Sequence, residues 1–140
     1  MVSEQNIGRC LMALDYGERR IGVAICRHGN SEVSPLTTVD ASSDAIGQIK
    51  YLIGLHRPDI LVVGRPRGLD GQSTAQTKKA EAFAGEIAAK TGLDVKLQDE
   101  TLTTVEAEKR LPKRIGVKER KALIDQVAAQ IILEDFLHGN

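Results

Sequence analysis

Residues 10–26 read CLMALDYGERRIGVAIC, and this stretch decides the fold. It contains two apolar runs, one that ends at Asp15 and one that begins at Ile21, with a short polar turn between them. The pattern favours two antiparallel β-strands joined by a tight turn. Residues 32–39 predict a third strand, which Pro35 would confine to the edge of the sheet. We therefore expect the chain to begin with a three-stranded antiparallel meander.

The rest of the chain alternates between helical and strand patterns. Residues 60–64 form a fully apolar run typical of a strand covered on both faces, so we place this strand at the centre of the sheet. Another strand is expected over residues 93–98. Helices are expected from a cap at Ser42 or Ser43 to Pro58, from Ser73 or Thr74 to about residue 90, over 103–111 and over 118–137. The sequence therefore predicts an α/β domain with a mixed sheet.

Composition limits the class of protein. With 41% hydrophobic and 27% charged residues, the 140 residues are expected to form a single globular domain, 1–140, around one core. No apolar stretch approaches the roughly 20 residues that span a bilayer, and no apolar signal region precedes Arg9. We therefore expect a cytoplasmic protein with no membrane partner. The 19 basic and 19 acidic residues cancel, so only a local excess of charge would indicate a polyanionic partner.

Three acidic residues lie at positions that indicate a metal site, two at predicted strand ends and one on the apolar face of a helix. Asp15 closes the first apolar strand, and Glu100 follows the predicted strand over 93–98. Asp125 lies on the apolar face of the last helix, where a buried carboxylate normally shifts its pKa, pairs with a cation or binds a metal ion. Together these acids predict an oxygen site for Mg²⁺ or Mn²⁺, and two such ions can clamp a phosphodiester during in-line displacement.

Each acid also has an ordinary interpretation. The first would be a common turn aspartate, because it stands two residues before a glycine. The second, or its neighbour Asp99, would cap the helix that follows. Asp125 would be stabilised in the first turns of its helix by the dipole and by pairing with Arg120 or Lys121.

Basic residues concentrate near the same elements. Between residues 101 and 121, seven basic and three acidic side chains give a local net charge of seven minus three, or +4. Such groups bind phosphates without reading sequence, although solubilising surface charge is the common alternative. Two tyrosines and two phenylalanines are too few for base stacking to dominate recognition. The candidate nucleic-acid-binding residues are Arg19, Arg20, Arg65, Arg67, Lys78, Lys109, Arg110, Lys113, Arg114 and Lys118.

Four sequence blocks cover almost the whole chain in a fixed order. They are ALDYG with RIGVA (13–17, 20–24), VVGRP with LDG (62–66, 69–71), DETLTTVEA (99–107) and IDQVAA (124–129). Read together, they closely resemble the YqgF/RuvX family. The resemblance implies an RNase H-like fold, in which the antiparallel meander is joined by two parallel strands to give a five-stranded mixed sheet flanked by helices.

The same resemblance implies a function. Members of the family are described as Holliday junction resolvases or as nucleases that mature the 5′ end of 16S ribosomal RNA. It implies a bacterial, metal-dependent endonuclease whose catalytic and metal-holding acids are Asp15, Glu100 and Asp125, with Asp99 as an alternative ligand. One or two Mg²⁺ or Mn²⁺ ions are the implied cofactors. The family usually has an arginine at the position of Thr101 and a leucine at that of Arg65, so we expect Arg65 to replace the missing arginine.

We therefore predict an endonuclease that acts on precursor 16S rRNA in ribosome biogenesis. The first alternative is a Holliday junction resolvase acting on branched DNA, which would be a homodimer because it must cut two symmetric strands. The second is a nucleic-acid-binding assembly factor that does not cut, although the presence of all three acids favours the enzyme. An ATPase of the actin type ranks last, since 140 residues leave no room for its second domain.

Overall fold

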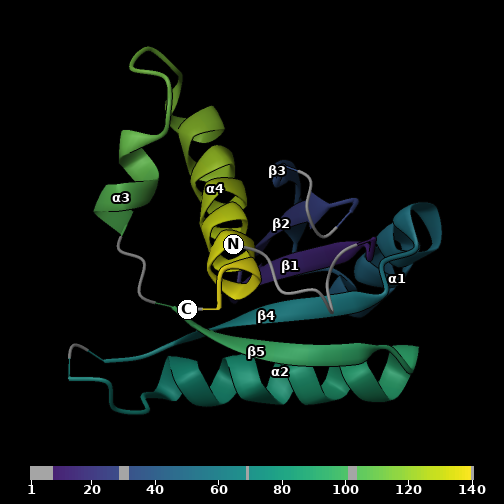
Figure 1. The fold of residues 1–140 in the computed structure, drawn as a ribbon. Coiled ribbons are helices and arrows are strands. Elements are labelled where there is room, and N and C mark those ends of the chain that lie inside the picture. Colours follow the sequence, from purple (N-terminus) through teal and green to yellow (C-terminus); the bar gives the residue numbers. More distant parts are fainter. Residues whose placement is uncertain (1–7, 29–31, 69, 101–103, 140) are drawn as a thin grey trace.

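The computed structural model describes residues 8–28, 32–68, 70–100 and 104–139 (Figure 1). The strands are β1 (Leu11–Tyr16), β2 (Arg20–Cys26), β3 (Ser34–Asp40), β4 (Ile60–Pro66) and β5 (Asp94–Glu100). The helices are α1 (Ala45–His56), α2 (Ala75–Thr91), α3 (Thr104–Lys109) and α4 (Val117–Leu137). The order of the predicted elements is confirmed.

The five strands form one sheet in the order β3-β2-β1-β4-β5. The first three strands are antiparallel neighbours, and β4 and β5 run parallel to β1, so the predicted mixed sheet is confirmed. Pro35 lies in β3 at one edge of the sheet, as expected. The expectation that residues 60–64 form the central strand is wrong, because β1 is central and β4 lies between it and β5.

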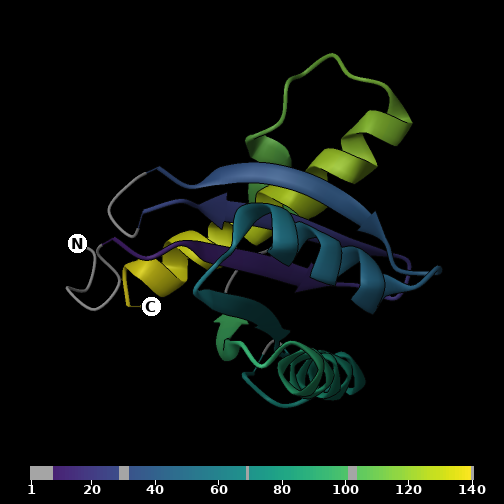
Figure 2. The ribbon, with the colours of Figure 1, turned by 90° about the vertical axis from the view of Figure 1, so that its right-hand side faces the viewer.

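Helices cover both faces of the sheet. The α1 and α2 helices lie on one face and α4 lies on the other (Figures 1 and 2). Alternating strand residues divide between the two layers: Met12 and Leu14 pack with Ile87 of α2, whereas Leu11 and Ala13 pack with α4. Burial on both faces explains why the interior strands read as continuous apolar runs.

Two helix caps refine the predicted boundaries. The α1 helix is capped by Asp44 rather than by Ser42 or Ser43, because the Asp44 carboxylate accepts a hydrogen bond from the backbone N–H of Gly47. The α2 helix begins with a reciprocal capping box between Thr74 and Thr77. None of the described helices is long and apolar enough to cross a membrane.

The α3 helix and the beginning of α4 project away from the sheet (Figures 1 and 2). We call residues 104–123 the arm. A small cluster of its own holds the arm to α4, where Ala107 and Leu111 pack on Val127 and Ile131. The arm therefore has an apolar support that is separate from the two layers of the main core.

Candidate active site

The end of β1 positions Asp15. Leu11 and Ala13 are buried against α4, and strand alternation gives Asp15 the same face, as the sequence predicts. Asp15 lies opposite Gly22 of β2 in the register of the sheet. Its partly buried side chain therefore lies at the carboxyl end of the central strand, on the face that α4 covers.

Gly22 allows α4 to lie directly on β2. A Cβ atom at this position would come within 1.9 Å of the backbone oxygen of Asp125, so even an alanine does not fit without a shift of the helix. The close approach brings Asp125 to the end of the sheet where Asp15 lies. The charge of Asp125 accordingly contributes to a raised pKa of Asp15.

Gly64 makes space for Glu100 on the other side of β1. A Cβ atom at position 64 would lie 2.6 Å from a carboxylate oxygen of Glu100, and the side chain of Ile132 would be nearer still. In the parallel register Gly64 follows Val63, which pairs with Leu14 of β1. The glycine therefore leaves the volume that the carboxyl group of Glu100 needs beside Asp15.

Asp15 and Glu100 form a hydrogen-bonded carboxyl pair. Burial raises the pKa of Asp15 well above its ordinary value of 3.8, and the charge of Glu100 and the hydrogen bond raise it further. Burial also raises the pKa of Glu100, while the hydrogen bond with Asp15 lowers it. Because two adjacent carboxylates repel each other, the pair retains a proton when no cation lies between them.

Asp15→Asn is expected to stabilise the metal-free protein at pH values above the ordinary pKa of an aspartate. Between the ordinary and the raised pKa of Asp15, the folded state binds more protons than the unfolded state, so the free energy of unfolding contributed by this group falls as the pH rises. Asparagine does not ionise, so the variant does not lose this part of the free energy of unfolding as the pH rises. Urea unfolding in EDTA should show that the free energy of unfolding of the variant, relative to wild type, increases as the pH rises from the ordinary pKa of Asp15 towards its raised pKa.

Asp99→Asn provides a control of opposite sign. The pKa of Asp99 is lowered by its hydrogen bond with Arg65 and by further contacts with Arg67, so its contribution to stability is present above the ordinary pKa and is lost in acid. This variant should be the less stable protein at neutral pH, with a difference that closes as the pH falls. Equal pH profiles for Asp15→Asn and wild type would contradict the raised pKa of Asp15.

Asp125 pairs with Arg20. The Nε of Arg20 donates a hydrogen bond of 2.6 Å to a carboxylate oxygen of Asp125, and the Asp125 side chain is 20% exposed. The alternative that this acid pairs with Arg120 or Lys121 is wrong, because the helix turns it toward the sheet and toward β2. An arginine therefore balances this carboxylate, whereas Asp15 and Glu100 are hydrogen-bonded to each other.

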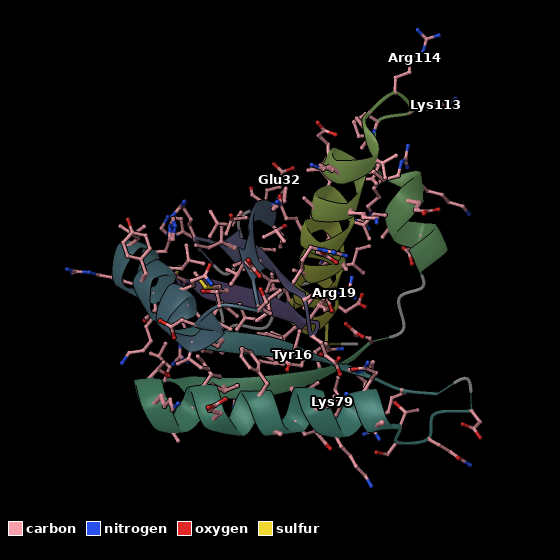
Figure 3. All side chains as sticks on the ribbon, turned by 180° about the vertical axis from the view of Figure 1, so that it is seen from behind. Tyr16, Arg19, Glu32, Lys79, Lys113 and Arg114 are labelled. Atoms are coloured by element: carbon pink, nitrogen blue, oxygen red, sulfur yellow. The ribbon has the colours of Figure 1, made fainter. Side chains whose placement is uncertain are left out.

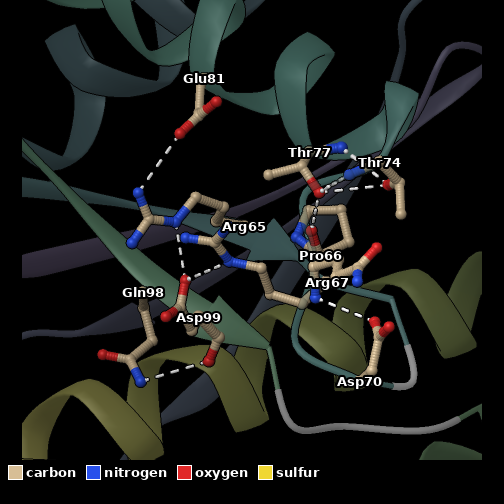
Figure 4. A network of polar contacts seen from close by, with 10 residues as sticks. Arg65, Pro66, Arg67, Asp70, Thr74, Thr77, Glu81, Gln98 and Asp99 are labelled. Carbon is tan, nitrogen blue, oxygen red and sulfur yellow. Dashed lines mark hydrogen bonds and ion pairs between the residues drawn. The ribbon is translucent and has the colours of Figure 1, made fainter.

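Asp99 belongs to a different cluster (Figure 4). Its carboxylate accepts hydrogen bonds from Arg65 at 2.7 Å and from Arg67 at 3.3 Å, and Arg65 also contacts Glu81 of α2 at 3.3 Å. Neighbouring residues of a strand point to opposite faces, so Asp99 lies on the α2 side of β5 and Glu100 on the α4 side. The structure therefore brings Glu100, and not Asp99, to Asp15.

The structure divides the candidate basic residues into two groups. Four are ion-paired within the protein: Arg20, Arg65, Arg67 and Arg110, the last with Glu134. The other six form no ion pair with another described residue: Arg19, Lys78, Lys109, Lys113, Arg114 and Lys118. Lys113 and Arg114 extend from the tip of the arm, well away from Tyr16 and Arg19 at the end of β1 (Figure 3).

The donor chemistry of the acidic pair suits a divalent cation. Across the described residues, no group of three or more His, Cys, Asp or Glu side chains is already arranged around a metal position. The carboxyl oxygens of Asp15 and Glu100 nevertheless lie together in a space that two glycines keep open. Mg²⁺ and Mn²⁺ prefer hard oxygen ligands such as these carboxylates. A bound ion would take the place of the proton between the two carboxyl groups.

Sequence reasoning assigned no role to Gly22, Gly64 or the pairing of Arg20 with Asp125. The signal for the glycines was available, because a glycine inside an apolar strand often marks a close approach of another element. The ion pair had no comparable local signal, since its two residues are 105 positions apart.

The solved structures with a similar fold include two complexes with Holliday junctions. The Fowlpox virus resolvase, solved in complex with Holliday junction DNA, matches with a TM-score of 0.62 and 10% identity over 93% of this chain and 97% of its own. Thermus thermophilus RuvC, also solved with a Holliday junction substrate, matches with a TM-score of 0.53 and 14% identity over 94% of each chain. The protein therefore has the RNase H-like fold of this class.

Sequence comparison identifies the family. Residues 9–139 match the model of the RuvX family, described as Holliday junction resolvase, and the chain belongs to this family. A relative from Methylobacillus flagellatus is 39% identical over 134 residues, which cover 93% of this chain and 91% of the relative. A relative from Roseiflexus sp. is 42% identical over 130 residues, covering 91% and 92%. Both carry the name "Putative pre-16S rRNA nuclease".

Proposed function

We propose that this protein is a divalent-metal-dependent endonuclease that hydrolyses phosphodiester bonds. The observation that carries the proposal is the carboxyl pair of Asp15 and Glu100 at the strand ends, with Asp125 beside it. One or two Mg²⁺ or Mn²⁺ ions held there would activate a water molecule and stabilise the charge that develops on the phosphate. Asp15 and Glu100 would be the main ligands, and Asp125 the third.

The chain's own residues perform the remaining tasks. Asp15 and Glu100 give up their shared proton, so that both carboxylates are available as ligands. Gly22 and Gly64 keep the acids together, because Gly22 lets α4 lie on β2 and Gly64 leaves room for the carboxyl group of Glu100. The unpaired basic residues bind the nucleic-acid backbone through its phosphates, with Arg19 near the site and the others on α2 and the arm.

Precursor 16S rRNA is the substrate that we favour, and the cytoplasm the location. The names of the relatives from Methylobacillus flagellatus and Roseiflexus support this choice. A branched DNA junction is the second candidate, because the family model is described as Holliday junction resolvase and two similar folds were solved with such DNA. That activity would need a homodimer that presents two sites to one junction.

A side-by-side cleavage assay tests the proposal. A labelled 5′ segment of precursor 16S rRNA and a four-way DNA junction are incubated with the protein in Mn²⁺, in Mg²⁺ and in EDTA. We expect cleavage of the RNA with either metal and none in EDTA. Preferential, symmetric cutting of the junction would instead identify a resolvase. Binding of both substrates without cleavage in either metal would replace the enzyme with an assembly factor.

A further inference from the structure

The arm contains a hollow of about 410 Å³ between the end of α3 and the first turns of α4. Three cationic side chains and one carboxylate line it, which gives a net charge of three minus one, or +2. An apolar wall completes the hollow, and Leu111 in this wall is only 9% exposed. The lining residues are Glu108, Lys109, Leu111, Pro112, Lys113 and Arg120.

The cations of this hollow have no partner within the described part of the chain. Lys109, Lys113 and Arg120 form no ion pair there, and none of their side chains donates a hydrogen bond to another described residue. Some cations elsewhere in the described chain are balanced by a carboxylate: Arg20 binds Asp125, and Lys79 binds Glu18. Three unpaired cations that line one concave surface favour an anionic ligand.

The position on α4 adds a second argument. The positive end of a helix dipole favours acidic residues, yet the first turns of α4 contain three cations, Lys118, Arg120 and Lys121, beside one acid, Glu119. Gly116 precedes the helix and provides no side-chain cap for its backbone N–H groups. The carboxylate of Glu119, which lies over Gly116, offsets only one of these three positive charges, and a bound anion would offset more of them.

We propose that the arm hollow binds a backbone phosphodiester of the substrate strand at a distance from the bond that is cut. This inference rests on the proposed nuclease function and assigns to it a second subsite. The hollow lies on the face of α4 that packs on α3, whereas Asp125 faces the sheet. A strand held at both places would have to pass around the start of α4, which would fix its direction across the acidic pair.

Binding measurements in EDTA test the subsite without cleavage. The probes are the fluorescein-labelled 5′ segment of precursor 16S rRNA and the labelled four-way DNA junction, followed by anisotropy. Lys109→Gln, Lys113→Gln and Arg120→Gln should each weaken binding about three- to tenfold. Because the three cations act on one phosphate, the triple variant should lose less than the product of the single losses. Its slope of log K against log salt should fall by about 0.7 to 0.9, the value for one phosphate contact.

Two further variants make the test decisive. Glu108→Gln removes the carboxylate of the hollow and should strengthen binding. The control Lys50→Gln, Lys90→Gln, Lys96→Gln removes the same charge from exposed positions on α1, α2 and β5 and should leave binding within twofold of wild type.

The possible outcomes separate this inference from the function on which it rests. If wild type binds and cuts but the arm triple variant binds like the control, the subsite is wrong and the nuclease remains. Fully multiplicative losses would indicate independent surface charges and would also overturn the subsite. If wild type binds neither RNA nor DNA, the proposed function fails as well. The probe that wild type binds more tightly, the RNA segment or the DNA junction, identifies the nucleic acid whose phosphodiester occupies the hollow.

Discussion

Asp15→Asn is expected to reduce the rate of phosphodiester cleavage by about a thousandfold or more, and Asp125→Asn to reduce it comparably. A divalent ion stabilises the charge of the transition state by several kcal/mol, and each 1.36 kcal/mol corresponds to about a tenfold change in rate. The Asp15 carboxyl group is half of the buried pair that we assign to the metal. An amide keeps its shape but cannot supply the negative charge that holds the ion.

Single-turnover cleavage with Mn²⁺ measures this effect, and Asp94→Asn is the matched control. Asp94 is an exposed aspartate at the opposite end of β5, so the same substitution there should leave the cleavage rate unchanged. Urea unfolding of Asp15→Asn, which is expected to be at least as stable as the metal-free wild type, distinguishes a loss of the metal ligand from unfolding. A cleavage rate within tenfold of wild type in Asp15→Asn would contradict its assignment as a metal ligand.

The strands and helices follow from the sequence because burial leaves a periodic pattern. Residues 11–14 and 60–63 are continuous apolar runs, and both form interior strands with two covered faces. The prediction that residues 60–64 form the central strand was wrong because the two runs are equally apolar. Their sequences do not reveal which of the two strands lies at the centre of the sheet. The cap at Asp44 was missed because two serines just before it are equally good capping residues.

The candidate site was only partly predictable for a related reason. Strand alternation gave the face of Asp15, and the end of β5 gave the position of Glu100. Neither pattern reveals how closely α4 crosses the sheet, so the pairing of Asp125 with Arg20 could not be deduced from local sequence. The division of basic residues into paired and unpaired groups likewise depends on tertiary contacts such as that of Arg110 with Glu134.

Gly22→Ala is expected to destabilise the protein by about 3 kcal/mol and to impair cleavage as well. Overpacking of a close-packed core typically costs about 1–3 kcal/mol, and here the added Cβ would meet backbone that cannot rotate away. The helix must therefore move as a unit. Because α4 carries Asp125, its displacement separates this carboxylate from Asp15 and Glu100. Urea unfolding in EDTA measures the first effect, and single-turnover cleavage with Mn²⁺ measures the second.

Gly85→Ala separates this contact from the general effect of replacing glycine. A Cβ atom at position 85, within α2, would have no neighbour within 4 Å, so alanine should stabilise the helix by up to about 1 kcal/mol and leave cleavage unchanged. The two substitutions are chemically identical, but Gly22 lies in a strand directly under α4, whereas Gly85 lies in a helix with open space around its Cα. If Gly22→Ala folded with wild-type stability and cut at the wild-type rate, α4 would not be seated on β2 in the way that positions Asp125. If Gly22→Ala kept its stability but lost cleavage, a shift of α4 too small to disturb the core would be large enough to disrupt the acidic site.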